Sequence, residues 1–374
     1  MPNRLPMEPR NDRVLALAWT CVSLTALVVR VWLALTAPPS IDLQNYAETV
    51  RVLHTDAPFY ESADHYNYSP VWSWVLRAAD AASRSTGVGL TPVVRSILVA
   101  VDVGCAALLF LLSSGAGASI RWRSAGLYLA NPVGIWVSAV QGQFDALALL
   151  FLLAAIASAR RRASDGSALR PMAWLAFSLA CKHVTLFHPV LFVRRRKDVR
   201  WLPVPYLFTA LLFLPYASQW RAIRDRVLLY RSVPSSYGFS EFVLYESRLG
   251  TIVMALALLA GLAAALWLRG RDLERGSLIL FLVLLFFAPG IGPQYFVWPL
   301  TLGALRPTLG YFALTGSAIL WILGTHFGWP GSAQFLGHVV WLCVAFWAIR
   351  EIKKTRDSKF KVHEGSEPPS RFES

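Results

Sequence analysis

Long apolar stretches recur along the whole chain and alternate with short polar segments. Because a helix of about 20 apolar residues spans a hydrocarbon core roughly 30 Å thick, this pattern is typical of membrane-spanning helices. We therefore predict an all-α, polytopic membrane protein with about 10–12 transmembrane or re-entrant helices. The predicted segments lie near residues 14–37, 93–114, 124–140, 145–159, 171–182, 183–193, 201–217, 248–268, 277–290, 294–305, 308–324 and 335–349.

Several of these segments need a more specific interpretation. The pairs near residues 171–193 and 277–305 are short for a bilayer, and we expect broken or re-entrant helices there. The first stretch follows Arg4, Arg10 and Arg13, as the apolar region of a signal peptide would. It is too long for a cleaved region of that kind, so we interpret it as an uncleaved first span.

Lysine and arginine are distributed unevenly between the two sides of this arrangement. With the N-terminus inside, the inner segments hold 25 of the 36 basic residues and the outer ones hold eight. Cytoplasmic loops carry such an excess of positive charge. We predict a multi-pass protein of the plasma membrane with both termini cytoplasmic and two long outer segments, 38–92 and 218–248. The aromatic, amphipathic stretch that starts at Tyr68 suits a helix lying along the interface.

Composition narrows the classes of function and of partner. The net charge of +14 would suit nucleic acid, but the basic residues sit in short clusters between apolar runs, so we exclude that partner and expect membrane lipids instead. The four cysteines all fall in apolar segments and show neither a disulfide framework nor zinc spacing. We predict one membrane domain over residues 1–350 and a disordered cytoplasmic tail over 351–374, which is polar and charged.

Two carboxylates are expected at the same outer depth. Asp42 follows the first span by about five residues, and Asp145 lies at the tip of a helical hairpin in the stretch Gln-Gly-Gln-Phe-Asp, together with Gln143. A carboxylate there can take a proton from a sugar hydroxyl. Asp42 alone would equally suit a helix cap or a solvated position. Asp145 and Gln143 lie between apolar helices, where polar side chains are costly without partners.

Cationic candidates lie near the same level. Lys182 and His183 interrupt an apolar stretch, and a charge in such a place is a functional hypothesis, although Lys182 could instead reach the interface with its long side chain. Arg221 and Arg224 fall on one face of a short helix in the second outer segment. These four side chains could bind phosphate. Ordinary contact with lipid headgroups is the alternative for the two arginines.

A turn rich in glycine and proline, Ala-Pro-Gly-Ile-Gly-Pro, precedes Gln294 and Tyr295. Non-helical backbone at membrane depth is tolerated where it lines a cavity, so these two side chains could face the cavity of Asp42; a simple hairpin turn is the alternative. Asp102 lies in the middle of a span with Arg95 two turns earlier, and we expect a structural role for it. Arg30, toward the outer end of the first span, could reach the interface.

Together these motifs resemble those of the GT-C glycosyltransferases over most of residues 14–350. The stretch from Asp42 to Trp72, ending in Tyr-Asn-Tyr-Ser-Pro-Val-Trp, looks like the bacterial polyprenyl-phosphate-mannose-dependent mannosyltransferases, and so do the segments 131–145 and 288–298. Lys182 and His183 followed by Pro189 resemble the dolichyl-phosphate-glucose-dependent glucosyltransferases. Each motif alone is short, but the four occur in the order of the family.

The resemblance implies a GT-C fold and an inverting transfer of a hexose, with mannose expected, from a polyprenyl-phosphate-sugar donor to a glycan or glycolipid acceptor at the outer face. Asp42 matches the catalytic base of the family. The resemblance and the charge of the leaving phosphate together lead us to expect these residues in the substrate site: Tyr68, Gln143, Asp145, Lys182, His183, Arg221, Arg224, Gln294 and Tyr295. Many members carry a second acidic residue next to the base, whereas this chain has Leu43 and Gln44. No metal ligands and no required cofactor are therefore predicted, and dependence on a divalent metal is left open.

Two other classes of function were weighed. A transporter or flippase of a lipid-linked sugar would also need polar residues in an outer cavity, but we expect matching half-repeats and access from both sides for it, and the sequence shows neither. A structural membrane protein without chemistry would not need so many polar residues at one depth. The hypothesis of an enzyme is therefore favoured.

Overall fold

The computed structural model describes residues 9–162, 166–230, 235–241, 247–329 and 331–364. Every regular element in these ranges is a helix, which confirms the predicted all-α class. In chain order they are α1 (Pro9–Thr36), α2 (Ile41–Leu53), α3 (Phe59–Ser62), α4 (Pro70–Thr86), α5 (Leu90–Leu112), α6 (Ala118–Leu129), α7 (Pro132–Ile135), η1 (Trp136–Gln141), α8 (Asp145–Arg160), α9 (Leu169–Cys181), η2 (His183–Thr185), α10 (His188–Phe192), η3 (Arg196–Trp201), α11 (Pro203–Leu211), η4 (Leu214–Gln219), α12 (Trp220–Ile223), η5 (Arg224–Leu228), α14 (Ser247–Leu268), α15 (Leu273–Phe286), η6 (Pro293–Phe296), α16 (Val297–Gly303), α17 (Leu309–His326) and α18 (Ser332–Glu364).

Within the described residues, five helices are long and apolar enough to cross a membrane: α1, α5, α14, α17 and α18. A sixth crossing is formed if the segments 196–211 and 214–228, which meet at a bend of 60°, act as one span. Large apolar side chains of α1 and α14 are exposed, as expected for helices that face lipid. The chain is thus an all-α, polytopic membrane protein.

Several of the predicted spans are short helices inside the bundle instead of full crossings. The segment predicted at 145–159 is α8, with 16 residues, and the segment predicted at 277–290 is α15, with 14. Half of the side chains of α8 and most of those of α15 are buried. Apolar helices of this length are typical of a protein core, because neighbouring helices cover them on all sides. Five crossings are supported by length and composition among the described residues, and the count of about 10–12 transmembrane or re-entrant helices stays a prediction.

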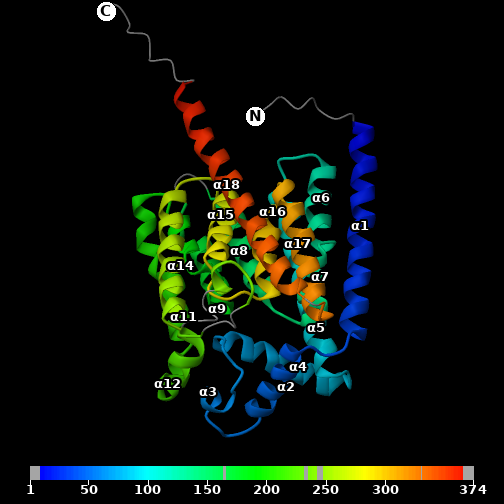
Figure 1. Cartoon of the computed structure of the whole chain (residues 1–374), viewed down its shortest axis with the longest axis vertical. Coiled ribbons are helices and arrows are strands. Elements are labelled where there is room, and N and C mark those ends of the chain that lie inside the picture. The colour runs from blue at the N-terminus through cyan, green and yellow to red at the C-terminus, as the bar shows by residue number, and fades with distance from the viewer. Residues whose placement is uncertain (1–8, 163–165, 231–234, 242–246, 330, 365–374) are drawn as a thin grey trace, which may run out of the picture.

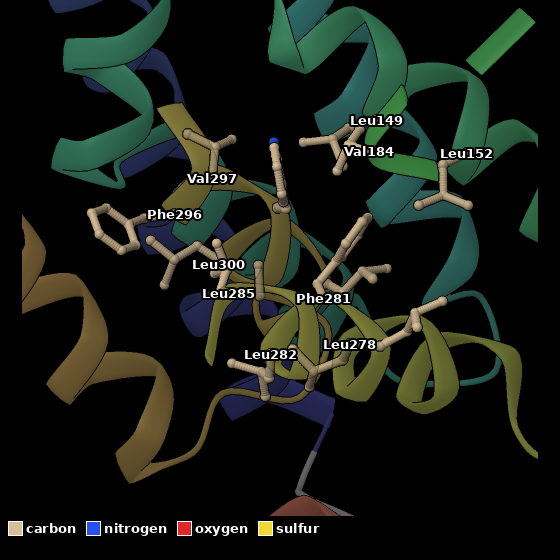
Figure 2. Close-up of a cluster of buried hydrophobic side chains, with 14 of the residues drawn as sticks. Leu149, Leu152, Val184, Leu278, Phe281, Leu282, Leu285, Phe296, Val297 and Leu300 are labelled. Carbon is tan, nitrogen blue, oxygen red and sulfur yellow. The ribbon is translucent and has the colours of Figure 1, made fainter. Parts of the chain in front are cut away.

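These short helices form the centre of the hydrophobic core (Figure 2). Apolar side chains of α8, η2, α15 and α16 contact one another there, and they remove a large apolar area from solvent or lipid. The labelled members are Leu149, Leu152, Val184, Leu278, Phe281, Leu282, Leu285, Phe296, Val297 and Leu300.

The two ends of the bundle differ in what they carry (Figure 1). Helix α1 begins and α18 ends at one end of the molecule, whereas α2, α3, α4 and α12 lie at the other. The two long segments that we predicted on one side of the membrane are thus found together. Arg226 ties them to each other, because it donates to Tyr60 O (2.8 Å) and pairs with Asp64 (2.9 Å). Helix α18 does not end at residue 350 but continues to Glu364, through the first part of the predicted disordered tail, and residues 365–374 lie outside the described residues.

A buried ion pair joins α1 to α5. Arg30 Nη1 lies 2.6 Å from Asp102 Oδ2, and both side chains are almost completely buried. Arg30 also donates to the carbonyls of Leu129 (2.9 Å) and Gly134 (3.1 Å), and the Tyr128 hydroxyl donates to Asp102 (2.6 Å). The suggestion that Arg30 reaches the interface is therefore wrong: it is the partner of Asp102 and fixes the end of α6.

Candidate functional site

Asp42 lies in the first turn of α2, where a carboxylate interacts favourably with the helix dipole. Ser40 caps this helix by accepting from Leu43 N (3.3 Å) and donates its hydroxyl to Gln141 O (2.5 Å). The amide of Gln141 donates to Asp42 Oδ2 (3.1 Å). Asp42 is half-buried, and this contact joins it to a segment about a hundred residues away in sequence.

The loop that carries Gln141 follows from its local sequence. Asn131 accepts from Val133 N and Gly134 N, so it caps a helix that begins at Pro132 and widens into the π-helical turn η1. Gly142 ends this helix at φ 80°, a conformation that favours glycine. A Cβ at Gly142 would lie 2.8 Å from the side chain of Leu43, so glycine also allows α2 to approach this closely.

Asp145 begins α8 behind this loop and is completely buried. Lys182, at the end of α9, pairs with its Oδ2 (2.6 Å), and the indole N–H of Trp298 donates to its Oδ1 (2.7 Å). Lys182 is only 7% exposed, so it does not extend to the interface as the alternative interpretation suggested. The partners that a buried carboxylate needs are thus supplied by α9 and α16.

Aromatic rings surround the Lys182 ammonium. Its Nζ lies 5.9 Å from the ring centroid of Tyr68, 5.2 Å from that of Phe144 and 5.8 Å from that of Tyr295. Phe144 in turn stacks on Trp72, with ring centroids 4.0 Å apart. Such rings favour a cation by their quadrupole and present flat surfaces on which a sugar ring can pack. The motifs around Tyr68, Asp145, Lys182 and Tyr295 therefore meet at one place.

Gln143 connects Asp42 to this group. Its side chain is buried next to the Asp42 carboxylate and the Tyr68 hydroxyl, and its Oε1 accepts no hydrogen bond from the described residues. Burial raises the pKa of Asp42 above the ordinary value of 3.8, while Gln143, Gln141 and the positive charge of Lys182 act in the opposite direction. A carboxylate with a raised pKa and a nearby cation is suited to accept a proton.

An apolar cavity of about 150 Å³ lies beside this group. Tyr295 and Trp298 separate the two and line the cavity, and His183 lines it as well. The remaining lining is almost entirely apolar and comes from η2, α14, α15 and the turn after α15: Val184, Leu186, Phe187, Met254, Ala257, Leu258, Leu284, Leu285, Ala288, Pro289 and Gly290, with Tyr230. The site thus combines a polar group with an adjoining apolar space.

The structure does not bring every candidate into this group. His183 is exposed toward the cavity, and Gln294 lies on the same turn as Tyr295, with a buried Oε1 that accepts no hydrogen bond from the described residues. Arg221 is exposed on α12, and Arg224 pairs with the exposed Asp225 (2.7 Å). No described contact joins either arginine to Asp42 or Lys182.

Two side chains of the site were not among the predicted site residues. Gln141 holds Asp42, and Trp298 holds Asp145. Both lie within the stretches that carry the family resemblance, Asn131–Asp145 and 288–298, so their motifs could have drawn attention to them. The sequence does not show which carboxylate either side chain contacts, and only the fold shows that each donates to one.

No protein-family model, curated protein or solved structure matches this chain. The site's chemistry must therefore be inferred from its own residues. Within the described part of the chain, no three His, Cys, Asp or Glu side chains lie close enough to hold a metal ion. The group is suited to proton transfer and to binding an anion beside Lys182, next to a space that an apolar chain can occupy.

Proposed function

We propose that the protein is an inverting glycosyltransferase with a GT-C fold. It moves a hexose, mannose in the first instance, from a polyprenyl-phosphate-sugar donor to a glycan or glycolipid acceptor. The reaction takes place at the outer face of the plasma membrane, with both termini cytoplasmic. The observation that carries this proposal is the half-buried Asp42 carboxylate beside the buried Asp145–Lys182 pair and an adjoining apolar cavity.

Asp42 acts as the general base. Its carboxylate takes the proton of the acceptor hydroxyl, while the hydroxyl oxygen forms a bond to the anomeric carbon of the donor sugar. The bond between that carbon and the phosphate oxygen breaks on the opposite face, so the configuration inverts. Gln141 and Gln143 hold the carboxylate in the orientation that this proton transfer needs.

Lys182 stabilises the phosphate that leaves. Negative charge grows on the polyprenyl phosphate as the sugar departs, and a fixed cation stabilises it more in the transition state than in the ground state. An ammonium has three N–H donors, and among the described residues one is used by Asp145. Asp145 therefore fixes the position of the ammonium and leaves donors for a phosphate. His183 adds a donor from the cavity side, with Gln294 on the neighbouring turn.

The apolar cavity receives the start of the lipid chain. Its lining residues come from α14 and α15, and polyprenyl chains are hydrocarbon, so burial in this cavity favours the donor over a soluble sugar phosphate. Tyr68 and Tyr295 flank Lys182 and provide surfaces for the sugar ring. In this proposal Arg221, exposed on α12, and Arg224, which pairs with Asp225, contact the headgroup phosphate as the donor arrives.

Transfer of labelled mannose from polyprenyl phosphate by the purified protein tests the proposal. We expect the substitution Asp42→Asn to lower the rate by about 10²–10⁴-fold, because general base catalysis typically contributes that much. The matched control is Glu48→Gln, which removes an exposed carboxylate from the same helix, α2, and leaves the rate unchanged.

Three results would contradict the proposal: no transfer by the wild-type protein, full activity of Asp42→Asn, or accessibility labelling that places residue 42 on the cytoplasmic side. Glucose- and arabinose-charged donors, assayed in parallel, identify the sugar. Mass spectrometry of lipid-linked glycans from cells with and without the gene identifies the acceptor.

A further inference from the structure

Arg95 is a completely buried arginine of α5 that binds only backbone carbonyls in the described structure. Its Nη1 donates to Ala37 O (2.6 Å), and its Nη2 donates to Pro38 O (2.7 Å) and to Val140 O. No carboxylate pairs with it among the described residues. A buried charge without a counter-ion is costly, so this arrangement needs a physical reason.

The reason lies in the three carbonyls. Ala37 and Pro38 follow the last residue of α1, and Val140 lies in the last turn of η1. The final carbonyls of a helix lack partners within the helix and carry its negative dipole end, and both effects favour a cation. Arg95 therefore satisfies the ends of two helices at once, and its planar fork reaches both.

Both helix ends lead directly into the candidate site. Pro38 precedes Asp42 by four residues, and Val140 is followed immediately by Gln141, which donates to Asp42. The hydroxyl of Ser40 makes a second link between the same two segments, through Gln141 O (2.5 Å). Arg95 and Ser40 together fix the start of α2 against the end of η1.

We propose that Arg95 is a positioning residue that sets the register between Asp42 and Gln141, and so orients the carboxylate for proton transfer; its effect on turnover rests on the proposed function. Arg95 contacts neither carboxylate nor substrate and acts through the two backbone segments. A side chain that merely stabilised the fold would change the amount of folded protein but not the properties of Asp42.

The test compares the wild-type protein with Arg95→Lys and Ser40→Ala, reconstituted in lipid. A lysine keeps the positive charge but cannot bridge three carbonyls as a planar guanidinium does. Ser40→Ala removes the second link without leaving a charge unpaired. Arg77→Lys is the matched control, because Arg77 is an exposed arginine of α4 with one weak contact, to Leu53 O (3.4 Å).

The first readout needs no catalysis. Dicyclohexylcarbodiimide modifies protonated carboxyl groups, and mass spectrometry of the Asp42 peptide as a function of pH gives the pKa of that group. Because the Gln141 hydrogen bond favours the carboxylate, its loss should move the titration of Asp42 to higher pH in Arg95→Lys and, less strongly, in Ser40→Ala. The charged neighbours Asp145 and Lys182 and the hydroxyl of Tyr68 are the same in every variant.

The second readout is turnover of the polyprenyl-phosphate-sugar. We expect kcat of Arg95→Lys to fall by up to about 100-fold at unchanged KM for the donor. The acid limb of the profile of rate against pH should move to higher pH, as the titration of Asp42 does. A wild-type titration of Asp42 in both variants would overturn the inference, whether or not they fold less well. If the wild-type protein shows no transfer but the titration moves as expected, the proposed function fails and the positioning role stands.

Discussion

Arg30–Asp102 and Lys182–Asp145 are the two most deeply buried ion pairs among the described residues, and they have the same length but different surroundings. Arg30 and Asp102 are 2.6 Å apart between α1 and α5, and Lys182 and Asp145 are 2.6 Å apart between α9 and α8. Around the first pair, three backbone carbonyls and the Tyr128 hydroxyl complete the hydrogen bonds. Around the second lie aromatic rings, the candidate base Asp42 and, beyond Trp298, a cavity.

The comparison shows that burial of an ion pair does not by itself indicate a functional site. Arg30 is a brace between helices, because its guanidinium donates to carbonyls and to one carboxylate and its side chain is completely buried. A lysine that gives one donor to a carboxylate and faces rings and a cavity can bind something more. The substitutions below separate these two roles.

The largest expected effect is on stability, for Arg30→Met. Removal of one partner leaves Asp102 as an uncompensated buried charge, so we expect the free energy of unfolding to fall by about 3–5 kcal/mol. Thermal or SDS-induced unfolding of the purified protein measures it. Arg10→Met, on an exposed position of the same helix, is the control. Unchanged stability of Arg30→Met would show that this pair is not a brace.

The next effect is on catalysis, for the double substitution Asp145→Leu with Lys182→Met. Because both charges are removed together, stability changes little, but transfer falls by about 10²–10³-fold as the leaving phosphate loses its cation. The comparison variant is Arg30→Met with Asp102→Leu, whose rate per folded molecule should equal that of the wild type. If the two double variants lost activity equally, the Asp145–Lys182 pair would have no catalytic role distinct from that of the Arg30–Asp102 pair.

A smaller effect is expected for one hydrogen bond removed from each region. Tyr128→Phe removes a donor to Asp102, and Gln141→Leu removes a donor to Asp42. A hydrogen bond to a charged group contributes about 1.5–3 kcal/mol. We expect Tyr128→Phe to appear in unfolding measurements and Gln141→Leu in kcat. If Tyr128→Phe lowered kcat and Gln141→Leu lowered only the stability, the roles given to the two ion-pair regions would be wrong.

The smallest expected effect is the gradual dependence of the transfer rate on pH. Asp42 must be ionised to act as a base, so the rate should rise about tenfold per pH unit below its pKa and level off above it. Burial raises this pKa, so the midpoint should lie above 3.8. The sign for stability is opposite: the raised pKa favours the protonated folded protein, and stability is lost as the pH rises through that value. A midpoint at or below 3.8 would argue against Asp42.

The sequence predicted which residues belong to the site better than it predicted which side chains they contact. The polar residues Asp42, Gln143, Asp145 and Lys182 stood out because such side chains are rare between apolar helices, and the structure brings them together. That Asp145 bonds to Trp298, 153 positions away, depends on how α16 packs against α8. No spacing along the chain encodes such a contact.

The membrane crossings show where sequence reasoning reaches its limit. Apolar character predicted the helices, but it does not distinguish lipid from protein as the apolar neighbour, so the sequence alone did not show how deeply α8 is buried by neighbouring helices. The partner of Asp102 also depends on the fold: Arg30 pairs with it from 72 positions away, although Arg95 is much closer in sequence.

The cavity beside the site has one thin wall. Met254, Ala257 and Leu258 of α14 line it, while Leu256 and Leu259 of the same helix are exposed where lipid would be. A donor held there would reach the cavity sideways, by diffusion within the leaflet, and would never dissolve in water. Its encounter rate would follow the number of donor molecules per unit area of bilayer, so adding empty lipid would slow the protein even at constant bulk concentration.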